Sequence, residues 1–335
     1  MQYQPISSQI INTINASAYP LIVSHEKPDG DTLGAGLAMS QFLTRSGKKY
    51  KYFCPEEPAD YFSYLPNIEK IINNPQELDW ANHDLIIVID CASLLRTGLA
   101  DNLLKIKGKI PLINIDHHQS NDYYAQHNLV MPKASSTSEI IYKIFELNNI
   151  EIDKYMATAL LTGILTDTMN FTNAITTKES LEIASKLLNF GARLNQIVSN
   201  LNQNKNLSIL KLWGKVFSQL EFNEQHNFVY TIISEEDLIA HQMSADEARD
   251  GLANFLSFLQ NINFILVLTE QADKTIKGSL RTMANDIDVS RIAGIFGGGG
   301  HKKAAGFKIS QLPTGIDQDW KNFIINAIIN ELNKT

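Results

Sequence analysis

Residues 84–90 read Asp-Leu-Ile-Ile-Val-Ile-Asp, an apolar and largely β-branched run that begins and ends on an acidic residue. Such a run is typical of a strand that is buried on both faces of a parallel sheet. Shorter strand-like runs stand at 20–24, 49–54 and 110–115, and apolar residues at helical spacing stand between them, as at 33–46. Strands that alternate with helices predict an α/β domain with a mostly parallel sheet.

The chain continues beyond this sheet into a second region. Helix-like periodicity runs from about 136 to 190, and a polar, Asn-rich segment at 199–206 then predicts a domain edge. A chain of 335 residues fits two domains better than one. We therefore predict a larger domain at 1–198, a helical linker at 199–216 and a second, smaller α/β domain at 217–335.

Strand-like and helix-like segments are mixed in the second domain. We predict hairpin-like strands near 217–222 and 228–233, further strands near 262–269, 275–281 and 304–309, and helices near 244–258, 288–296 and 318–332. The glycine run that precedes 304–309 is predicted to be a loop.

The composition limits the class of partner. Hydrophobic residues make up 44% of the chain, so a sizeable core is expected, and the net charge is −7. An acidic chain argues against long duplex DNA or RNA, because such binding relies on many Lys and Arg contacts to phosphate. A small anionic ligand remains compatible, since bound cations offset the carboxylates around them. The N-terminus lacks a signal-peptide pattern and no stretch approaches a membrane span, so we expect a cytoplasmic protein.

Acidic residues and histidines occur where predicted elements end. Those that follow the strands or end the helix near 155–166 are His25, Asp29, Asp31, Asp90, Asp116, His117, His118 and Asp167. Carboxyl ends of parallel strands meet at one edge of a sheet, where ligand crevices form, so the clusters after the strands are expected to converge. One cluster alone is more often a helix cap or a turn. Carboxylates gathered with imidazoles suit Mn²⁺ or Mg²⁺, because without a cation the carboxylates would repel one another.

A glycine run near the C-terminus gives a second signal. Residues 297–301 read Gly-Gly-Gly-Gly-His, and Arg281 ends a predicted strand. Glycines let the backbone approach a ligand closely and point N–H groups at an anion, and an Arg can bind phosphate in bidentate fashion. The alternative is a flexible turn beside a solvated Arg. Together the features favour a phosphate or nucleotide site in the second domain.

The chain resembles the DHH phosphoesterases, in which a DHH catalytic domain precedes a DHH-associated domain. The resemblance spans nearly the whole chain and rests on five ordered motifs. They are His25-x-x-Pro28-Asp29-Gly30-Asp31, Asp90 in VIDCAS, Asp116-His117-His118, Asp167 in GILTDT, and FGGGGHKKAAGF at 296–307. The length and two-domain layout look most like the branch of oligoribonucleases and phosphatases of 3′-phosphoadenosine 5′-phosphate (pAp).

The resemblance implies a centre of two divalent cations, usually Mn²⁺, with Mg²⁺ as the other candidate. His25 and Asp29 would bind one ion, Asp31, His117 and Asp167 would bind the other, and Asp90 would bridge the two. Asp116 would orient His117, and His118 would contact the scissile phosphate. The residues implied to hold the substrate's phosphate, across a cleft between the domains, are Arg281, Gly298, Gly299, Gly300 and His301.

The implied activity is hydrolysis of short single-stranded oligonucleotides, in the manner of an exonuclease, or of pAp. A phosphodiesterase of linear or cyclic dinucleotides of the c-di-AMP type, or a polyphosphatase, is the alternative within the same chemistry. A non-catalytic nucleotide-binding protein on the same scaffold would be expected to lack a metal ligand, and all six ligands are present. A homodimer is compatible with the sequence.

Two positions depart from the family pattern. Ala35 stands where relatives often have Ser, and Met169-Asn170-Phe171-Thr172 follows Asp167-Thr168 where relatives often have Gly and then Phe-Arg. The second departure leaves the choice among pAp, short RNA, short DNA and dinucleotides open.

Overall fold

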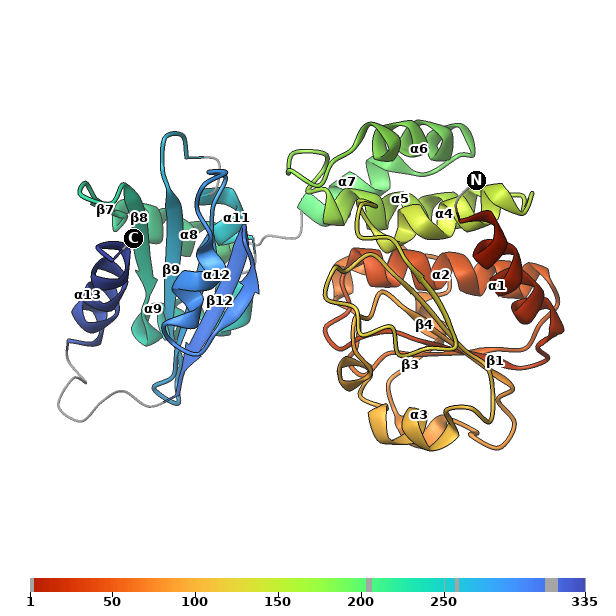
Figure 1. The fold of residues 1–335 in the computed structure, drawn as a ribbon. Helices are drawn as coiled ribbons and strands as arrows, with labels where there is room; N and C mark the ends of the chain where they lie inside the picture. Colours follow the sequence, from red (N-terminus) through yellow and green to blue (C-terminus); the bar gives the residue numbers. More distant parts are fainter. Residues whose placement is uncertain (1–2, 203–206, 250, 257–258, 311–318, 335) are drawn as a thin grey trace. The chain divides into compact units, whose positions relative to one another are not determined.

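The computed structural model describes residues 3–202, 207–249, 251–256, 259–310 and 319–334 (Figure 1). The chain divides into two compact units, Met1–Asn204 and Lys205–Thr335. Each unit has a six-stranded sheet and its own hydrophobic core. The boundaries expected from the sequence, 1–198, 199–216 and 217–335, remain predictions. Within the described residues, no helix is both long and apolar enough to span a bilayer.

The sheet of the first unit is parallel throughout. Its strands, in spatial order, are β3 (Ile71–Ile72), β2 (Lys51–Phe53), β1 (Pro20–Val23), β4 (Leu85–Ile89), β5 (Leu112–Asp116) and β6 (His127–Val130). The apolar part of the run at 84–90 forms strand β4 in the middle of the sheet, and each of its residues is buried. The strand order reverses direction between β1 and β4, which is the place where open α/β sheets bind ligands.

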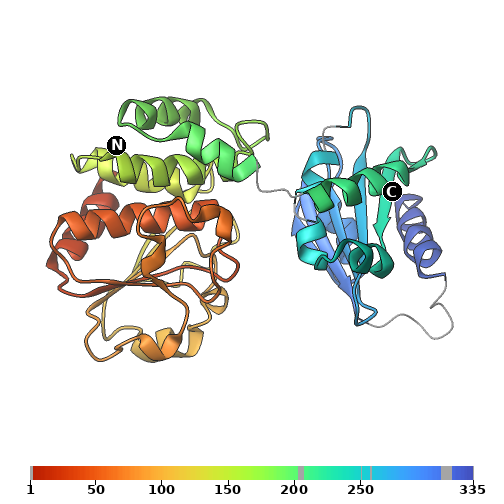
Figure 2. The same ribbon diagram turned by 180° about the vertical axis from the view of Figure 1, so that it is seen from behind.

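Helices cover both faces of this sheet (Figures 1 and 2). Six helices lie on one side: α1 (Gln4–Ala16), α2 (Gly30–Arg45), α4 (Thr137–Leu147) and α5 (Lys154–Asp167), with α6 (Lys178–Asn189) and α7 (Leu194–Asn202) packed on α5 in an outer layer. Helix α3 (Ala100–Ile106) packs on the other face. Side chains alternate along β4, so that Ile87 and Ile89 join the first core and Ile86 and Val88 join the second. Short 3-10 turns occupy Asp60–Phe62, Ile68–Lys70, Pro75–Glu77 and Leu94–Thr97.

Two glycines bring α2, α4 and α5 close together at the functional edge. A Cβ at Gly34 would lie 2.3 Å from the carbonyl oxygen of Ala159, and one at Gly163 would lie 2.0 Å from Ser138 Oγ and 2.6 Å from Asp31 Oδ1. Both positions exclude any larger residue. The close approach lets the first turn of α4 reach a carboxylate on α2.

The sheet of the second unit is mixed. Its order is β11 (Gly299–His301), β12 (Ala304–Ile309), β10 (Ile276–Arg281), β9 (Phe264–Glu270), β8 (Phe228–Ile233) and β7 (Glu221–Asn223), with only β8 and β9 parallel. One face packs on α8 (Leu207–Ser218), α9 (Glu235–His241), α10 (Ala245–Arg249) and α11 (Leu252–Leu256). The other packs on α12 (Val289–Gly294) and α13 (Trp320–Leu332). The predicted α/β fold, with a mostly parallel sheet followed by a smaller α/β unit, is confirmed.

Several boundaries differ from the sequence-based predictions. The helix predicted at 244–258 is broken between α10 and α11 by Gly251, which has φ of +81°. The strand predicted from 217 begins only at Glu221, because α8 continues to Ser218. The glycine run is partly an edge strand, β11, and not a loop. The predictions at 203–206, 250, 257–258 and 318 lie outside the described residues.

Candidate metal centre

The candidate ligands of the first unit lie at the carboxyl edge of its parallel sheet. Strand β1 ends at Val23, β4 at Ile89 and β5 at Asp116, and the predicted residues lie at these strand ends, in the loops that follow and in the first turn of α2. Asp167 is the last residue of α5, which packs tightly against α2. The edge therefore gathers residues that are far apart in the sequence.

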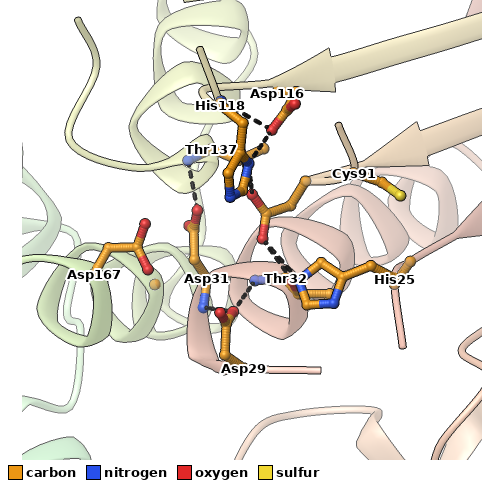
Figure 3. Close-up of polar contacts among 12 residues, drawn as sticks. His25, Asp29, Asp31, Thr32, Cys91, Asp116, His118, Thr137 and Asp167 are labelled. Atoms are coloured by element: carbon orange, nitrogen blue, oxygen red, sulfur yellow. Dashed lines mark hydrogen bonds and ion pairs between the residues drawn. The ribbon is translucent and has the colours of Figure 1, made fainter. Parts of the chain in front are cut away.

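The structure brings all six predicted ligands together. Figure 3 labels four of them, His25, Asp29, Asp31 and Asp167. Their ligand atoms form groups within 4.8 Å: His25 with Asp29 and Asp90, Asp31 with His117 and Asp167, and Asp90 with His117 and His118. His117 Nε2 lies 3.2 Å from Asp167 Oδ2 and 3.7 Å from Asp90 Oδ1. Asp90 thus belongs to the group around His25 and also lies beside His117, which is the arrangement expected of a bridging ligand.

Two of the carboxylates are positioned by helix N-termini. Asp29 Oδ1 accepts the backbone N–H groups of Asp31 and Thr32 at the start of α2, so Asp29 is a helix cap as well as a candidate ligand. Asp31 is fully buried, and its oxygens accept the N–H groups of Thr137 and Ser138 at 2.6 and 2.8 Å. These N–H groups open α4 and have no partner within the helix, which makes a carboxylate their natural acceptor.

Asp90 is held from both sides. It is 1% exposed and has φ of +58°, a left-handed conformation that Asp and Asn tolerate better than most residues. The hydroxyl of Thr32 donates to Oδ2 at 2.6 Å, and that of Thr137 donates to Oδ1 at 2.8 Å. Thr32 Oγ1 also lies 2.6 Å from His25 Nε2. Sequence reasoning did not single out either threonine.

The partner of Asp116 differs from the prediction. We expected Asp116 to orient His117, but the imidazole that its carboxylate contacts is that of His118, with Oδ1 2.7 Å from Nδ1. His117 reaches the same oxygen only through its backbone N–H, at 2.8 Å. Asn121 donates its side-chain amide to Asp116 Oδ2 at 2.6 Å. Asp116 is fully buried, so this network fixes the ring of His118.

The charges of the cluster shift its pKa values in a consistent pattern. Burial and the charges of neighbouring aspartates raise the pKa of Asp31 and of Asp167 well above the usual range. Burial also acts on Asp90, but the hydrogen bond from His25 and the nearby imidazoles outweigh it and leave the pKa of Asp90 low. The pKa of His118 is raised to about 9, because Asp116 and the charge of Asp90 outweigh its burial. Crowded carboxylates of this kind are relieved by a bound cation.

The donor set fits divalent cations of the Mn²⁺ or Mg²⁺ type. Four carboxylates and two imidazoles supply oxygen and nitrogen atoms, and neither cysteine belongs to a group of candidate ligands among the described residues. Hard oxygen donors suit Mg²⁺ and Mn²⁺, while imidazole donors favour a transition metal. Burial opposes a charged ring at His25, but the hydrogen bond and charge of Asp90 outweigh it and raise the pKa of His25. A cation would bind the neutral form of this ring.

The loop after Asp167 has an unusual backbone. Met169, Asn170 and Phe171 have φ of +50°, +56° and +64°, so three residues other than glycine occupy the left-handed region in succession. The side-chain amide of Asn173 donates to the carbonyl of Asp167 at 2.6 Å and ties the loop to the candidate ligand. This is the stretch that departs from the family pattern.

The predicted substrate residues of the second unit lie on neighbouring strands. His301 of β11 is paired with Ala304 of β12, and Ala304 is paired with Arg281 of β10. Directly paired residues share a face of the sheet, so Arg281 and His301 lie on one face, two strand spacings or about 10 Å apart. Burial lowers the pKa of Arg281, whose guanidinium also donates to the carbonyl of Leu280.

The glycines of this run differ in the space that a side chain would have at each position. A Cβ at Gly298 would lie 2.3 Å from the carbonyl of Gly306, whereas one at Gly299 would meet open space. Gly300 has φ of +142°. The rings of Phe296 and Phe307 contact each other at 4.4 Å between centroids, and Phe307 is buried in the core.

Comparison with known proteins agrees with this fold and motif order. The model of the DHH family N-terminal domain matches residues 21–164, and that of the DHHA1 domain matches 227–334. A bifunctional oligoribonuclease and PAP phosphatase of Thermus thermophilus is 27% identical over 98% of this chain and 94% of its own length. A cyclic-di-AMP phosphodiesterase of Listeria monocytogenes is 25% identical over 94% of this chain, which spans half of that relative.

A solved structure extends the likeness to the fold. The crystal structure of an exopolyphosphatase-related protein from Bacteroides fragilis has a TM-score of 0.88 and 24% identity, and covers 99% of this chain and 96% of its own. The two family models match, in turn, the unit with the parallel sheet and the unit with the mixed sheet. The chain belongs to the DHH family, with a DHH domain followed by a DHHA1 domain.

Proposed function

We propose that the chain is a phosphoesterase that uses two divalent cations to hydrolyse short single-stranded oligonucleotides and pAp. The observation that carries the proposal is the position of Asp90, which lies among ligand atoms of His25 and Asp29 and also beside His117. A buried carboxylate shared between two ligand groups is suited to a pair of cations rather than to one. Mn²⁺ is the first candidate and Mg²⁺ the second, since the imidazoles of His25 and His117 favour a transition metal.

Each residue has a defined part in this proposal. His25 and Asp29 would hold one cation, Asp31, His117 and Asp167 would hold the other, and Asp90 would serve both. Cations held in this way would lower the pKa of a water molecule and would stabilise charge on the phosphoryl oxygens. His118, fixed by Asp116, directs a protonated imidazole at the scissile phosphate and gives its proton to the leaving oxygen.

The second unit supplies substrate binding in the proposal. Arg281, the backbone of Gly298, Gly299 and Gly300, and His301 bind a terminal phosphate or nucleotide of the substrate. A site for one chain end, on an acidic protein of net charge −7, favours short substrates over long duplexes, which need many cationic contacts. A homodimer and a cytoplasmic location remain parts of the proposal.

A second candidate is cleavage of linear or cyclic dinucleotides. It is supported by the likeness to the phosphodiesterase of Listeria monocytogenes and by the altered loop Met169–Thr172 beside Asp167. The same cations and the same His118 would serve it. The two candidates differ in the substrate alone.

A hydrolysis panel tests the proposal. The full chain is incubated with Mn²⁺ and with pAp, a ribodinucleotide, a ribo-five-mer, a ribo-twenty-mer, cyclic di-AMP, linear pApA and tripolyphosphate. We expect turnover of pAp and of the dimer and five-mer, little turnover of the twenty-mer, and loss of activity when a chelator is added. Preferential turnover of cyclic di-AMP or pApA would favour the second candidate, and no turnover of any compound would overturn both.

A further inference from the structure

The two oxygens of Asp90 are each engaged by a threonine hydroxyl. Thr32, in the first turn of α2, donates to Oδ2, and Thr137, the first residue of α4, donates to Oδ1 (Figure 3). Both threonines are fully buried. Each therefore gives its only hydroxyl proton to the carboxylate, and the oxygen of Thr32 is also in contact with His25 Nε2 at 2.6 Å.

Thr137 also connects Asp90 to the other ligand group. Its backbone N–H donates to Asp31 Oδ2 at 2.6 Å, while its hydroxyl donates to Asp90 Oδ1 at 2.8 Å. Asp31 belongs to the group with His117 and Asp167, whereas Asp90 belongs to the group with His25 and Asp29. One residue of α4 thus sets the position of a carboxylate in each group.

The position of Thr137 is itself fixed by the start of α4. The hydroxyl of Ser136 caps the helix by accepting the N–H of Glu139, and the N–H of Ser138 binds Asp31 Oδ1 at 2.8 Å. The missing side chain at Gly163 leaves room for Ser138 against Asp31. The first turn of α4 therefore cannot shift without breaking bonds to Asp31.

We infer that Thr137 is a positioning residue of the metal centre, whose hydroxyl fixes the plane of the Asp90 carboxylate so that each oxygen directs its remaining lone pair at a different cation. This inference rests on the proposed function for the presence of the cations. The carboxylate of an aspartate rotates readily about its χ2 torsion, so a bridging carboxylate needs hydrogen-bond partners that fix the orientation of its plane. Each oxygen has room for a hydroxyl and a cation, because it carries two lone pairs.

Thr137 is the residue on which to test this role. Thr32 contacts both Asp90 and the Nε2 atom of His25, so its replacement would disturb two ligands at once. In Thr137→Val the hydroxyl is removed and the shape is kept, and in Thr137→Ser the hydroxyl is kept. Thr158→Val is the matched control, since Thr158 is 3% exposed and its hydroxyl donates to the carbonyl of Lys154 within α5.

The readout is the affinity for Mn²⁺ measured by calorimetry on the full chain, with turnover of a dinucleotide as a second readout. We expect Thr137→Val to weaken Mn²⁺ binding by about 10–100-fold, as removal of an outer partner of a ligand does, and to recover turnover at high Mn²⁺. Thr137→Ser and Thr158→Val should bind Mn²⁺ within a few-fold of the wild type, by the same reasoning. Should Thr137→Val fail to fold, Thr137→Ser compared with Thr137→Ala provides the same contrast.

The outcomes separate this inference from the proposed function. If the wild type binds Mn²⁺ and Thr137→Val binds it equally well, or if Thr137→Ser is as weak as Thr137→Val, the positioning role is wrong while the metal centre stands. Equal weakening in Thr158→Val would also overturn the role, because it would reflect lost stability in general. If the wild type binds no divalent cation, the proposed function itself fails.

Discussion

The two regions that carry the predicted site residues are built in opposite ways. At the carboxyl edge of the first sheet, Asp31 and Asp90 are buried and each accepts hydrogen bonds from neighbouring elements. At the edge of the second sheet, Gly299, Gly300 and His301 are exposed and offer mainly backbone. The first region depends on buried side-chain carboxylates, and the second combines the exposed backbone of these glycines with the side chain of Arg281 on a neighbouring strand. Substitutions should therefore fail for different reasons in the two regions.

The largest effect is expected from Asp90→Asn. The variant keeps the shape and a residue type that tolerates the left-handed backbone, but it removes the charge shared by both cations. Turnover should fall by more than the roughly 10–100-fold that loss of an outer partner costs. Steady-state kinetics with Mn²⁺ measures the loss, and circular dichroism confirms the fold. Turnover close to that of the wild type would show that Asp90 is not a bridging ligand.

Arg281→Ala tests whether the positive charge of Arg281 in the second region binds a phosphate of the substrate. Loss of a hydrogen bond to a charged phosphate costs about 1.5–3 kcal/mol, so KM should rise roughly 10- to 100-fold. Calorimetry with Mn²⁺ should give an affinity equal to that of the wild type, because the proposed cation ligands lie in the other unit. If Arg281→Ala lost Mn²⁺ binding while its KM stayed the same, the second region could not be the one that binds substrate and leaves the cations to the first.

Gly300→Ala and Gly299→Ala separate folding from binding at the exposed strand. A methyl group at Gly300 would lie 2.6 Å from the carbonyl of Ala304, at φ of +142°, so the variant should lose about 1–3 kcal/mol of unfolding free energy. A methyl group at Gly299 meets open space and should leave stability unchanged while it blocks the approach of a phosphate and raises KM. Denaturant unfolding and KM, measured together, check both variants; an unaltered KM in Gly299→Ala would argue against a backbone site.

The smallest effect concerns pH. Burial and neighbouring charges raise the pKa of Asp31 and Asp167 in the folded protein, so their contribution to stability is lost as pH rises from the unfolded value near 3.8 through the raised pKa. Cations bind the deprotonated carboxylates and compensate this loss. The rise in unfolding midpoint caused by Mn²⁺ should thus be larger at pH 7.5 than at pH 5.5. An equal rise at both values would contradict the assignment, and Asp90→Asn serves as the control.

Much of the first region could be predicted from the sequence. The run at 84–90 is strand β4, and chain order alone indicated that residues after β1, β4 and β5 would share one edge. The hydroxyl partners of Asp90 could not be predicted, because Thr32 and Thr137 lie 58 and 47 residues away and each reads as an ordinary residue at a helix start. The sequence likewise does not indicate that Asp116 contacts the ring of His118 and not that of His117, because this depends on the tertiary structure.

The second region was harder to predict because glycine carries little local information. Residues 299–301 favour a loop by composition, yet pairing with β12 makes them an edge strand. Gly251 ends a helix that apolar spacing had extended across it, because its φ of +81° belongs to the left-handed region. Both errors arise where a tertiary contact or a single backbone angle overrides the local pattern.

The central claim is that Asp90 joins two cations held by His25, Asp29, Asp31, His117 and Asp167. It is tested most directly by anomalous diffraction from crystals of the full chain grown with Mn²⁺. Two anomalous peaks about 3.5–4 Å apart are expected, with one oxygen of Asp90 directed at each. A single peak, or two peaks of which neither contacts Asp90, would contradict it.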